Sequence, residues 1–221
     1  MHIGLIGGIG PAATIAYYQR LVSSFAKAAV PLKLTITHAD ISVLTANASQ
    51  DLRIQQAAVF SDHLSQLQAG GCDIALITAL TGHFCFAETA VDSAVPLLNG
   101  IDVIDEHCRK QGIKRLGLLG SPPVLKTALF GMLNSPEVVR PTDPVNLGEA
   151  YMDVAMSGIC SDAQRALFFE AGAEMILQQG ATAVLLAGTD LGLVFGGHDP
   201  GYVVVDALEL HVQALLALAK S

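Results

Sequence analysis

Short apolar runs alternate with helix-period segments along the whole chain. Residues 2–6 form an apolar run that ends in glycines, as a buried parallel strand does. Residues 31–38 and 73–78 predict two further strands. Between these two, residues 52–67 repeat apolar side chains at helical spacing and end at Gly70-Gly71, a typical helix C-cap. This order favours a parallel β-sheet covered by helices.

Each predicted helix needs one apolar face to bury. After the first strand, apolar side chains spaced three or four apart predict an amphipathic helix that buries Ile15, Tyr18, Val22, Phe25 and Ala29. The helix at 52–67 is expected to bury Ile54, Ala57, Leu64 and Leu67.

The N-terminal pattern returns about half a chain later. Gly4–Gly8 reappears as Gly117–Ser121, an offset of 113 residues, and Ile74–Thr81 reappears more loosely as Ala183–Asp190, an offset of 109. Parallel strands share an apolar pattern ending in glycine in any case, but two agreeing offsets indicate an internal duplication.

The duplication predicts an α/β protein with two pseudo-symmetric lobes, each a parallel sheet flanked by helices. We expect the first lobe to contain residues 1–98 plus 202–221, and the second residues 99–201. Ligands of α/β sheets bind at the carboxyl ends of the strands, so a cleft between the lobes is the expected site.

Composition narrows the possible partners. The chain has twelve Lys and Arg residues and twenty Asp and Glu residues, which gives a net charge of −8. The sequence contains no stripe of positive residues of the kind that binds nucleic acid. No uninterrupted apolar stretch reaches the ~20 residues of a membrane span. The start shows no cationic signal-peptide region, and the four cysteines form no CxxC pair. We therefore expect a cytoplasmic protein with reduced thiols and neither a nucleic-acid nor a membrane partner.

A glycine-rich turn follows the first strand. In Gly7–Thr14, the glycines Gly8 and Gly10 allow backbone N–H groups to approach an anion at a helix N-terminus. The spacing differs from G-x-G-x-x-G, with Ala13 in place of the third glycine, so no dinucleotide site is expected. A carboxylate or phosphate loop and a purely structural turn both fit.

Polar residues also follow two later strands. Thr78 and the segment Thr81-Gly82-His83 come after the third strand, and Thr189-Asp190 occupies the matching place in the second half. Threonine hydroxyls with neighbouring N–H groups can hold a carboxylate. His83 is expected to be either an acid–base group or a structural histidine. Asp190 is expected to be either a general base or a helix N-cap. Asp206, five residues before His211, is expected to be an N-cap.

These motifs together resemble the aspartate/glutamate racemase superfamily, in particular its aspartate racemase branch. Gly4–Thr14 is similar to the family's opening signature, Gly117–Ser121 to its mid-chain turn ending in Ser121, and Asp206 to His211 to its C-terminal motif. The resemblance spans essentially the whole chain. It implies two α/β lobes, a cofactor-independent (PLP-independent) amino-acid racemase without a metal, a small carboxylate or amino-acid ligand, and a homodimer.

The family removes and returns an α-proton with two cysteines, and this chain lacks both. The resemblance places them at Ala79 and Gly188, whose side chains carry no proton. A general acid or base typically contributes 10²–10⁴-fold in rate, so two-thiol racemisation is not expected. Cys85 lies six residues after Ala79, about 120° around a helix, and is expected to be a packed core cysteine.

Three functions stay open from the sequence. One is an isomerase or lyase that uses His83 or Asp190, the second is a non-catalytic protein that binds a small acid, and the third is an interaction protein. Arg53 stands roughly where relatives place an arginine that binds the substrate side chain, but a solvated helix residue fits equally well.

Overall fold

Two parallel β-sheets form in separate parts of the chain, in a computed structural model that describes residues 1–221 apart from the side chain of Thr189. The chain divides into two units: Met1–Gly100 together with His211–Ser221, and Ile101–Leu210. The prediction of an α/β fold with two parallel sheets flanked by helices is confirmed.

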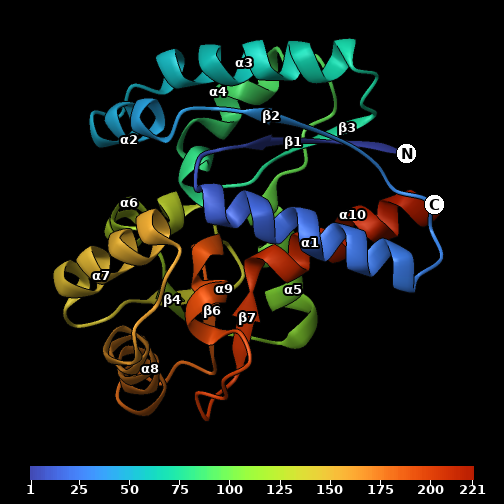
Figure 1. Ribbon diagram of the computed structural model, residues 1–221. Coiled ribbons are helices and arrows are strands. Elements are labelled where there is room, and N and C mark those ends of the chain that lie inside the picture. The colour runs from blue at the N-terminus through green and yellow to red at the C-terminus, as the bar shows by residue number, and fades with distance from the viewer. The chain divides into compact units, whose positions relative to one another are not determined.

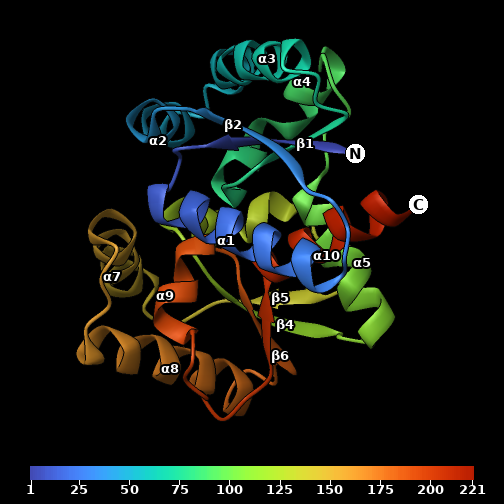
Figure 2. The same ribbon diagram turned by 45° about the vertical axis from the view of Figure 1, so that its right-hand side comes forward.

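The first unit contains a three-stranded sheet in the order β2-β1-β3. Its strands are β1 (His2–Gly7), β2 (Lys33–His38) and β3 (Ile74–Ile77). Its helical elements are α1 (Pro11–Lys27), α2 (Ile41–Ser49), α3 (Arg53–Ala69), the 3-10 helix η1 (Leu80–Cys85) and α4 (Phe86–Val91). Figures 1 and 2 show α3 on one face of this sheet and α1 on the other.

The second unit contains a four-stranded sheet in the order β5-β4-β6-β7. Its strands are β4 (Arg115–Leu119), β5 (Glu137–Val139), β6 (Ala183–Leu186) and β7 (Val204–Asp206). Its helical elements are α6 (Pro122–Thr127), η2 (Leu129–Gly131), α7 (Pro144–Ser157), α8 (Asp162–Leu177), η3 (Thr189–Leu191) and α9 (Gly192–Phe195). The chain passes between the units at the start of α5 (Gly100–Gln111) and within α10 (Ala207–Lys220).

The two sheets repeat one topology in one register. In the first sheet Gly4 pairs with Ala75, and in the second Gly117 pairs with Val184. These partners differ by the same two offsets that the sequence repeat predicts, 113 and 109 residues. The internal duplication is therefore confirmed at the level of strand pairing.

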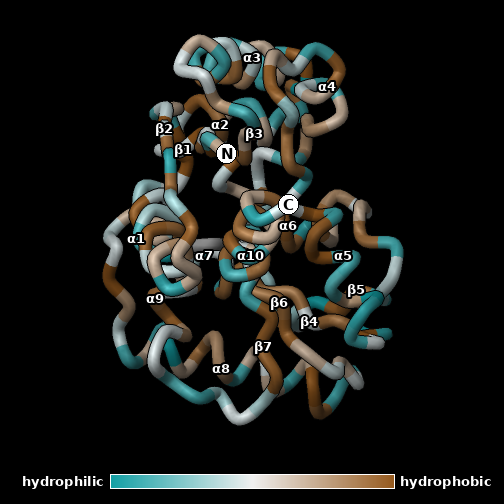
Figure 3. The backbone as a smooth tube through the Cα atoms, turned by 90° about the vertical axis from the view of Figure 1, so that its right-hand side faces the viewer, coloured by the Kyte–Doolittle hydropathy of each residue, from teal (hydrophilic) through white to brown (hydrophobic). Residues whose placement is uncertain are grey.

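Buried strands form the core of each unit. All six residues of β1 and all four of β6 are buried, as their continuous apolar sequences predict. Figure 3 shows the hydrophobic colouring along β6. Among the described residues, no helix has the length and apolar character needed to cross a membrane.

The predicted buried face of α1 is wrong except at Phe25. The helix buries Ala13, Tyr17, Leu21 and Phe25, whereas Ile15, Tyr18 and Val22 are 59%, 51% and 42% exposed. The buried residues and the exposed apolar residues both repeat at helical spacing, so the periodicity alone does not show which of the two sets is buried. On α3 the sequence likewise misplaces Ile54, which is 71% exposed, while Phe60 is buried.

The end of the second unit also differs from the expected boundary. The sequence predicts that residues 202–221 belong to the first lobe. In the structure β7 pairs in parallel with β6, and the second unit continues to Leu210. As expected, Asp206 caps α10: its Oδ1 accepts a hydrogen bond from the N–H of Leu208 at 2.9 Å.

Candidate functional site

The glycine turn after β1 is held together by its own polar groups. Gly8 and Gly10 have φ values of 83° and 113°, which favour glycine. A Cβ at Gly8 would lie 2.6 Å from Nδ1 of His38, so this position also needs the small residue. The Gly8 N–H donates to Oγ1 of Thr14 at 2.9 Å, and that hydroxyl donates to the Gly10 carbonyl.

The N-terminus of α1 begins at this turn. Gly10 is its N-cap and supplies no side-chain hydrogen bond, Pro11 follows, and the first turn contains no acidic residue. The positive end of a 17-residue helix is thus not neutralised by a carboxylate of its own first turn. The anion loop and the purely structural turn therefore both stay open, because the helix end has no acidic residue while the Gly8 N–H is already bonded to Thr14.

The loop after β3 (Thr78–Cys85) starts with residues fixed to the sheet. The Thr78 hydroxyl donates to the Ile6 carbonyl at 3.0 Å, which joins β3 to β1. Ala79 follows as the N-cap of η1, and Thr81 is half-buried. A Cβ at Gly82 would lie 2.8 Å from Cγ2 of Ile77, so this glycine lets η1 pack against the strand.

Both ring nitrogens of His83 are occupied by backbone groups. Nδ1–H donates to the Ala79 carbonyl at 3.2 Å, and Nε2 accepts from the Gly100 N–H at 3.1 Å. The side chain is 1% exposed and stacks on Phe86. Burial, with a smaller contribution from His211, lowers the pKa of His83 to about 3. This geometry favours the structural interpretation of His83 over the acid–base one.

His211 completes the same buried network. Its Nε2–H donates to the Gly100 carbonyl at 2.9 Å, and its Nδ1 accepts from the Tyr17 hydroxyl at 2.6 Å. Burial lowers the pKa of His211 to about 4. The backbone of Gly100 is therefore bonded by two neutral imidazoles, one on its N–H and one on its carbonyl.

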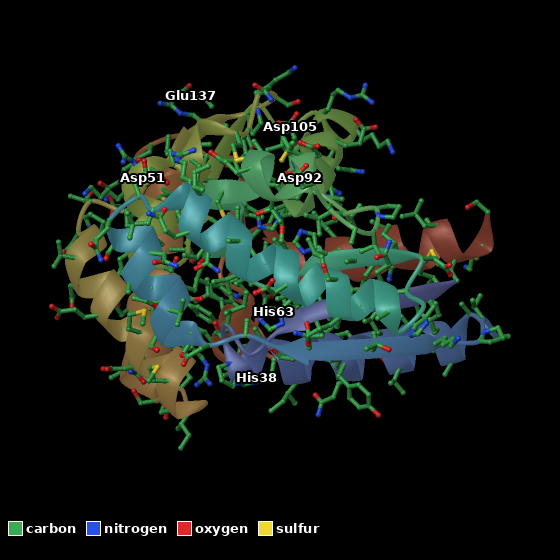
Figure 4. All side chains as sticks on the ribbon, turned by 90° about the horizontal axis from the view of Figure 1, so that it is seen from above. His38, Asp51, His63, Asp92, Asp105 and Glu137 are labelled. Carbon is green, nitrogen blue, oxygen red and sulfur yellow. The ribbon has the colours of Figure 1, made fainter. Side chains whose placement is uncertain are left out.

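Cys85 ends η1, and Arg53 begins α3. Cys85 is fully buried, with its thiol 3.7 Å from the Thr89 hydroxyl, and burial raises the pKa of this thiol to about 11. The thiol is therefore a packed core group, as expected. Arg53 begins α3 and pairs through Nε with Asp51 at 2.8 Å, its side chain 46% exposed. Figure 4 labels Asp51.

Two histidines that the sequence did not single out lie beside the glycine turn. His38 ends β2, and Figure 4 shows His63, on α3, next to it. Among the described residues, no hydrogen-bond partner reaches the buried Nδ1 of His63. Burial lowers the pKa of His63. Of the smaller contributions, the Asp62 carboxylate raises this pKa and the neighbouring His38 lowers it. Neither residue belongs to a recognisable motif: the pairing of β1 with β2 places His38 beside Gly7, and the packing of α3 places His63.

In the second unit, Ser121 lies at the end of β4. It is the N-cap of α6 and is 6% exposed, and its carbonyl accepts the Leu125 N–H at 2.9 Å. A groove of about 1140 Å³ opens beside α6 and α7, with Lys126 and Arg140 among its lining residues. None of the predicted site residues lines the described part of this groove.

Ala79 and Gly188, where the sequence resemblance places the two cysteines of the family, have the same backbone geometry. Ala79 has φ −120° and ψ 125°, and Gly188 has φ −122° and ψ 118°. Each is the N-cap of a 3-10 helix, and each carbonyl accepts a hydrogen bond from the N–H three residues later, Gly82 at 3.0 Å and Leu191 at 2.9 Å. The duplication therefore preserves the two strand-end turns although neither carries a thiol.

In the loop after β6 (Ala187–Leu191), the phenol ring of Tyr151 occupies the space in which a side chain of residue 188 would lie. A Cβ at Gly188 would stand 2.6 Å from the Tyr151 hydroxyl oxygen and still closer to the ring. Tyr151, from α7, donates to Oδ2 of Asp190 at 2.9 Å, and both side chains are buried. Burial, and then the Asp190 carboxylate, raises the pKa of Tyr151 well above its usual value. The side chain of Thr189 lies outside the described part of the structure.

Tyr151 is another residue beside a candidate site residue that sequence reasoning missed. It lies 37 positions before Gly188 in a helix without a motif, and only the packing of α7 on η3 joins the two. Among the described residues, no group of three or more His, Cys, Asp or Glu side chains could hold a metal ion. The polar groups described at these turns are hydrogen-bond donors and acceptors and the Asp190 carboxylate.

Comparisons with known proteins agree with this description. The sequence model of the family described as Asp/Glu/Hydantoin racemase matches residues 6–215. No curated protein sequence matches the chain closely enough to count as a relative.

Solved structures with the same fold include three racemase-type proteins. An aspartate racemase homologue from Pyrococcus horikoshii has a TM-score of 0.84 at 22% identity, covering 100% of this chain and 99% of that one. The aspartate racemase of Picrophilus torridus has a TM-score of 0.76 at 19% identity, covering 100% and 95%. Glutamate racemase from Francisella tularensis, in complex with D-glutamate, has 0.70 at 12% identity, covering 98% and 80%. At these identities the likeness shows a shared fold.

Proposed function

Because the chain belongs to the Asp/Glu/hydantoin racemase family, we propose that it binds a small carboxylate or amino acid at the ends of its parallel strands and does not racemise it with two thiols. The observation that carries this proposal is the matched pair Ala79 and Gly188. Both strand-end turns keep one backbone geometry, while neither residue has a side chain that can transfer a proton.

The four cysteines support the second half of the proposal. Cys72, Cys85 and Cys108 are buried, and Cys160 lies half-exposed just before α8. Burial raises the pKa of the first three thiols, to about 11 for Cys85 and Cys108. A thiol held protonated is a poor base, so none of these three replaces the missing pair.

The proposed ligand carboxylate is bound at the N-terminus of α1. Gly8 and Gly10 shape this turn, and the uncapped end of a long helix favours a negative charge. The other residues proposed to line the ligand are Thr78, Thr81, Gly82, Ser121 and Thr189, and Arg53 is proposed to bind a side-chain carboxylate. The proposed function requires no cofactor.

Binding is tested by calorimetry and thermal shift with the L- and D-forms of aspartate and glutamate. A ligand that binds the folded chain stabilises it by RT ln(1 + [L]/Kd), about 2.7 kcal/mol at a hundredfold excess over Kd. We expect Gly10→Ala, which forces a side chain onto a φ of 113°, to abolish the ligand-dependent stabilisation.

The matched control is Gly112→Ala. Gly112 also has a positive φ, 67°, but a Cβ there would meet open space, and it follows α5 rather than a strand. This variant is expected to lose some stability and to keep the ligand response. Absence of any stabilisation of the wild-type chain by these four acids and by a 5-substituted hydantoin contradicts the proposal.

A second candidate function is an isomerase or lyase that uses Asp190. The observation in its favour is the hydrogen bond from Tyr151 to Asp190, which orients a buried carboxylate two residues after Gly188. Turnover of a bound acid that is lost in Asp190→Asn separates this enzyme from a protein that only binds.

We also propose that the protein is a cytoplasmic homodimer. Ile15, Tyr18 and Val22 leave an apolar face of α1 exposed, and β2, at the edge of its sheet, exposes Ile36. Light scattering after size exclusion tests the dimer: Val22→Asp is expected to give a folded monomer, and a wild-type chain that is monomeric at micromolar concentration contradicts it.

A further inference from the structure

We propose that the groove beside α6 and α7 binds a short apolar peptide with both of its ends free. Lys126 and Arg140 bind the carboxylate of this peptide, and Glu149 and Asp153 bind its ammonium group. All residues that line the groove belong to the second unit, so the site is complete within one unit. It is separate from the proposed carboxylate site at α1, which belongs to the first unit, and does not depend on it.

The first argument is the size and lining of the groove. Its volume of about 1140 Å³ is slightly above the range of roughly 300–1,000 Å³ that is common for small-molecule sites. Figure 1 shows α6 beside α7, and the two helices meet where Pro122 packs on Gly148: a Cβ at Gly148 would lie 3.0 Å from Cγ of the proline. The apolar walls, which suit aliphatic side chains of a ligand, include Leu125, Val139, Pro141 and Met152.

The second argument is a cation that is fixed at one end of the groove. Nη1 of Arg140 donates to the carbonyls of Leu125 and Lys126, at 3.3 Å and 3.1 Å, in the last turn of α6. The Arg140 carbonyl in turn accepts from Nε2 of Gln179 at 2.9 Å, which fixes the backbone of the same residue.

The positive charges at this end have no carboxylate partner within the described part of the chain. Neither Lys126 nor Arg140 takes part in an ion pair there. Only Nη1 of the guanidinium is bonded to the backbone, so its Nε and Nη2 donors can face a ligand. A held arginine next to a lysine is well suited to bind a carboxylate.

The third argument is a pair of carboxylates on the opposite wall. Glu149 and Asp153 lie one turn apart on α7, and both are exposed and line the groove. Neither forms an ion pair with a described basic side chain. Like charges four residues apart on a helix repel each other, so a bound ammonium group is favoured at this place.

The spacing of the charges selects the length of the ligand. Arg140 is bonded to the last turn of α6, whereas Pro122, in the first turn, packs on Gly148, next to Glu149. The six residues of α6 extend over about 9 Å. An extended tripeptide spans about 10 Å, whereas a single amino acid carries both charges on one Cα. A tripeptide is therefore long enough to reach both ends of the groove.

Calorimetry with the full-length chain tests the peptide site. The probes are the tripeptide leucyl-alanyl-leucine with both ends free, its N-acetylated form, its C-amidated form, and triglycine. We expect the free tripeptide to bind and each blocked form to bind about tenfold more weakly, because one hydrogen-bonded charge is lost in each. Triglycine has the same two charges but no apolar side chain, and should bind at least tenfold more weakly.

Substitutions at exposed positions show which end of the peptide each charge binds. Lys126→Gln should weaken binding of the free tripeptide about tenfold and leave binding of the C-amidated form unchanged. Asp153→Asn should likewise weaken the free tripeptide and leave the N-acetylated form unchanged. Arg109→Gln is the matched control, because Arg109 is an exposed arginine of the second unit that pairs with Glu106 and does not line the groove. Its affinity for the free tripeptide should equal that of the wild type.

Three results overturn the inference: no binding of the free tripeptide at millimolar concentration, equal affinity for the free and blocked forms, and wild-type affinity in Lys126→Gln. A folded Gly10→Ala variant separates the inference from the proposed function. This variant should lose the response to aspartate and glutamate and keep the peptide affinity. Loss of peptide binding in Gly10→Ala assigns the peptide to the turn at α1 and contradicts the groove.

Discussion

Acid should destabilise this protein through its two buried histidines. The pKa values of His83 and His211 lie at about 3 and about 4 in the folded chain, mainly because burial disfavours the imidazolium. In the unfolded chain each imidazole titrates near pH 6.5. Folded pKa values below the unfolded ones mean that stability is complete above pH 6.5 and is lost as pH falls toward the folded values.

The loss can be calculated from this linkage. Between pH 7.5 and pH 5.0, one histidine that stays neutral in the folded state costs about 2 kcal/mol, so the pair costs about 4 kcal/mol. This is a large fraction of the 5–15 kcal/mol that stabilises a typical domain. Urea unfolding followed by circular dichroism at pH 7.5, 6.5, 5.5 and 5.0 measures it.

The variant His211→Gln separates the two contributions. It weakens the network at every pH, because the Tyr17 and Gly100 hydrogen bonds are disturbed. It should also remove about half of the loss between pH 7.5 and 5.0. His198→Gln, at an exposed position before β7, is the control and should keep the full loss. A wild-type free energy of unfolding that is constant over this range, or a His211→Gln variant with the full acid loss, refutes the reasoning.

Other outcomes follow from the same packing. Gly188→Ala should lower the free energy of unfolding by about 1–3 kcal/mol, because the new methyl group overpacks the space next to Tyr151. Adding Tyr151→Ala should relieve part of this cost, so chemical denaturation of the single and double variants should give a coupling energy above about 1 kcal/mol. If the two effects simply add, the expected contact between residues 188 and 151 is contradicted. Gly100→Ala should lower the melting temperature by several degrees, because its Cβ would lie 2.7 Å from the imidazole of His211. In the native protein, a thiol reagent such as Ellman's reagent should label Cys160 rapidly and should label the three buried cysteines only on unfolding. Fast labelling of two or more thiols in the native protein contradicts this expectation.

Much of the fold could be predicted because it depends on local patterns. The strands at His2–Gly7, Lys33–His38 and Ile74–Ile77 and the repeat of Gly4–Gly8 at Gly117–Ser121 are visible as apolar runs that end in glycine. The cap at Asp206 follows from its position before a helical pattern. These features involve neighbours in sequence, so the sequence contains the whole argument for them.

Helix faces could not be predicted in the same way. On α1 two apolar rows compete, and only tertiary packing, which includes the contact of Tyr17 with His211, selects the row of Tyr17 over that of Tyr18. The second unit extends to Leu210 for a similar reason: β7 is placed by pairing with β6, a long-range contact without a local signal.

The sequence by itself determined that residues 79 and 188 lack thiols, that both follow a strand, and that the two halves repeat. Tertiary structure alone decided what these positions can do. His83 became a buried anchor because Gly100, 17 residues away, bonds its second nitrogen, and Asp190 became an oriented carboxylate because α7 places Tyr151 beside Gly188. The physical reason is that protonation and hydrogen-bond geometry depend on burial and on partners distant in the chain, which no local pattern of residues specifies.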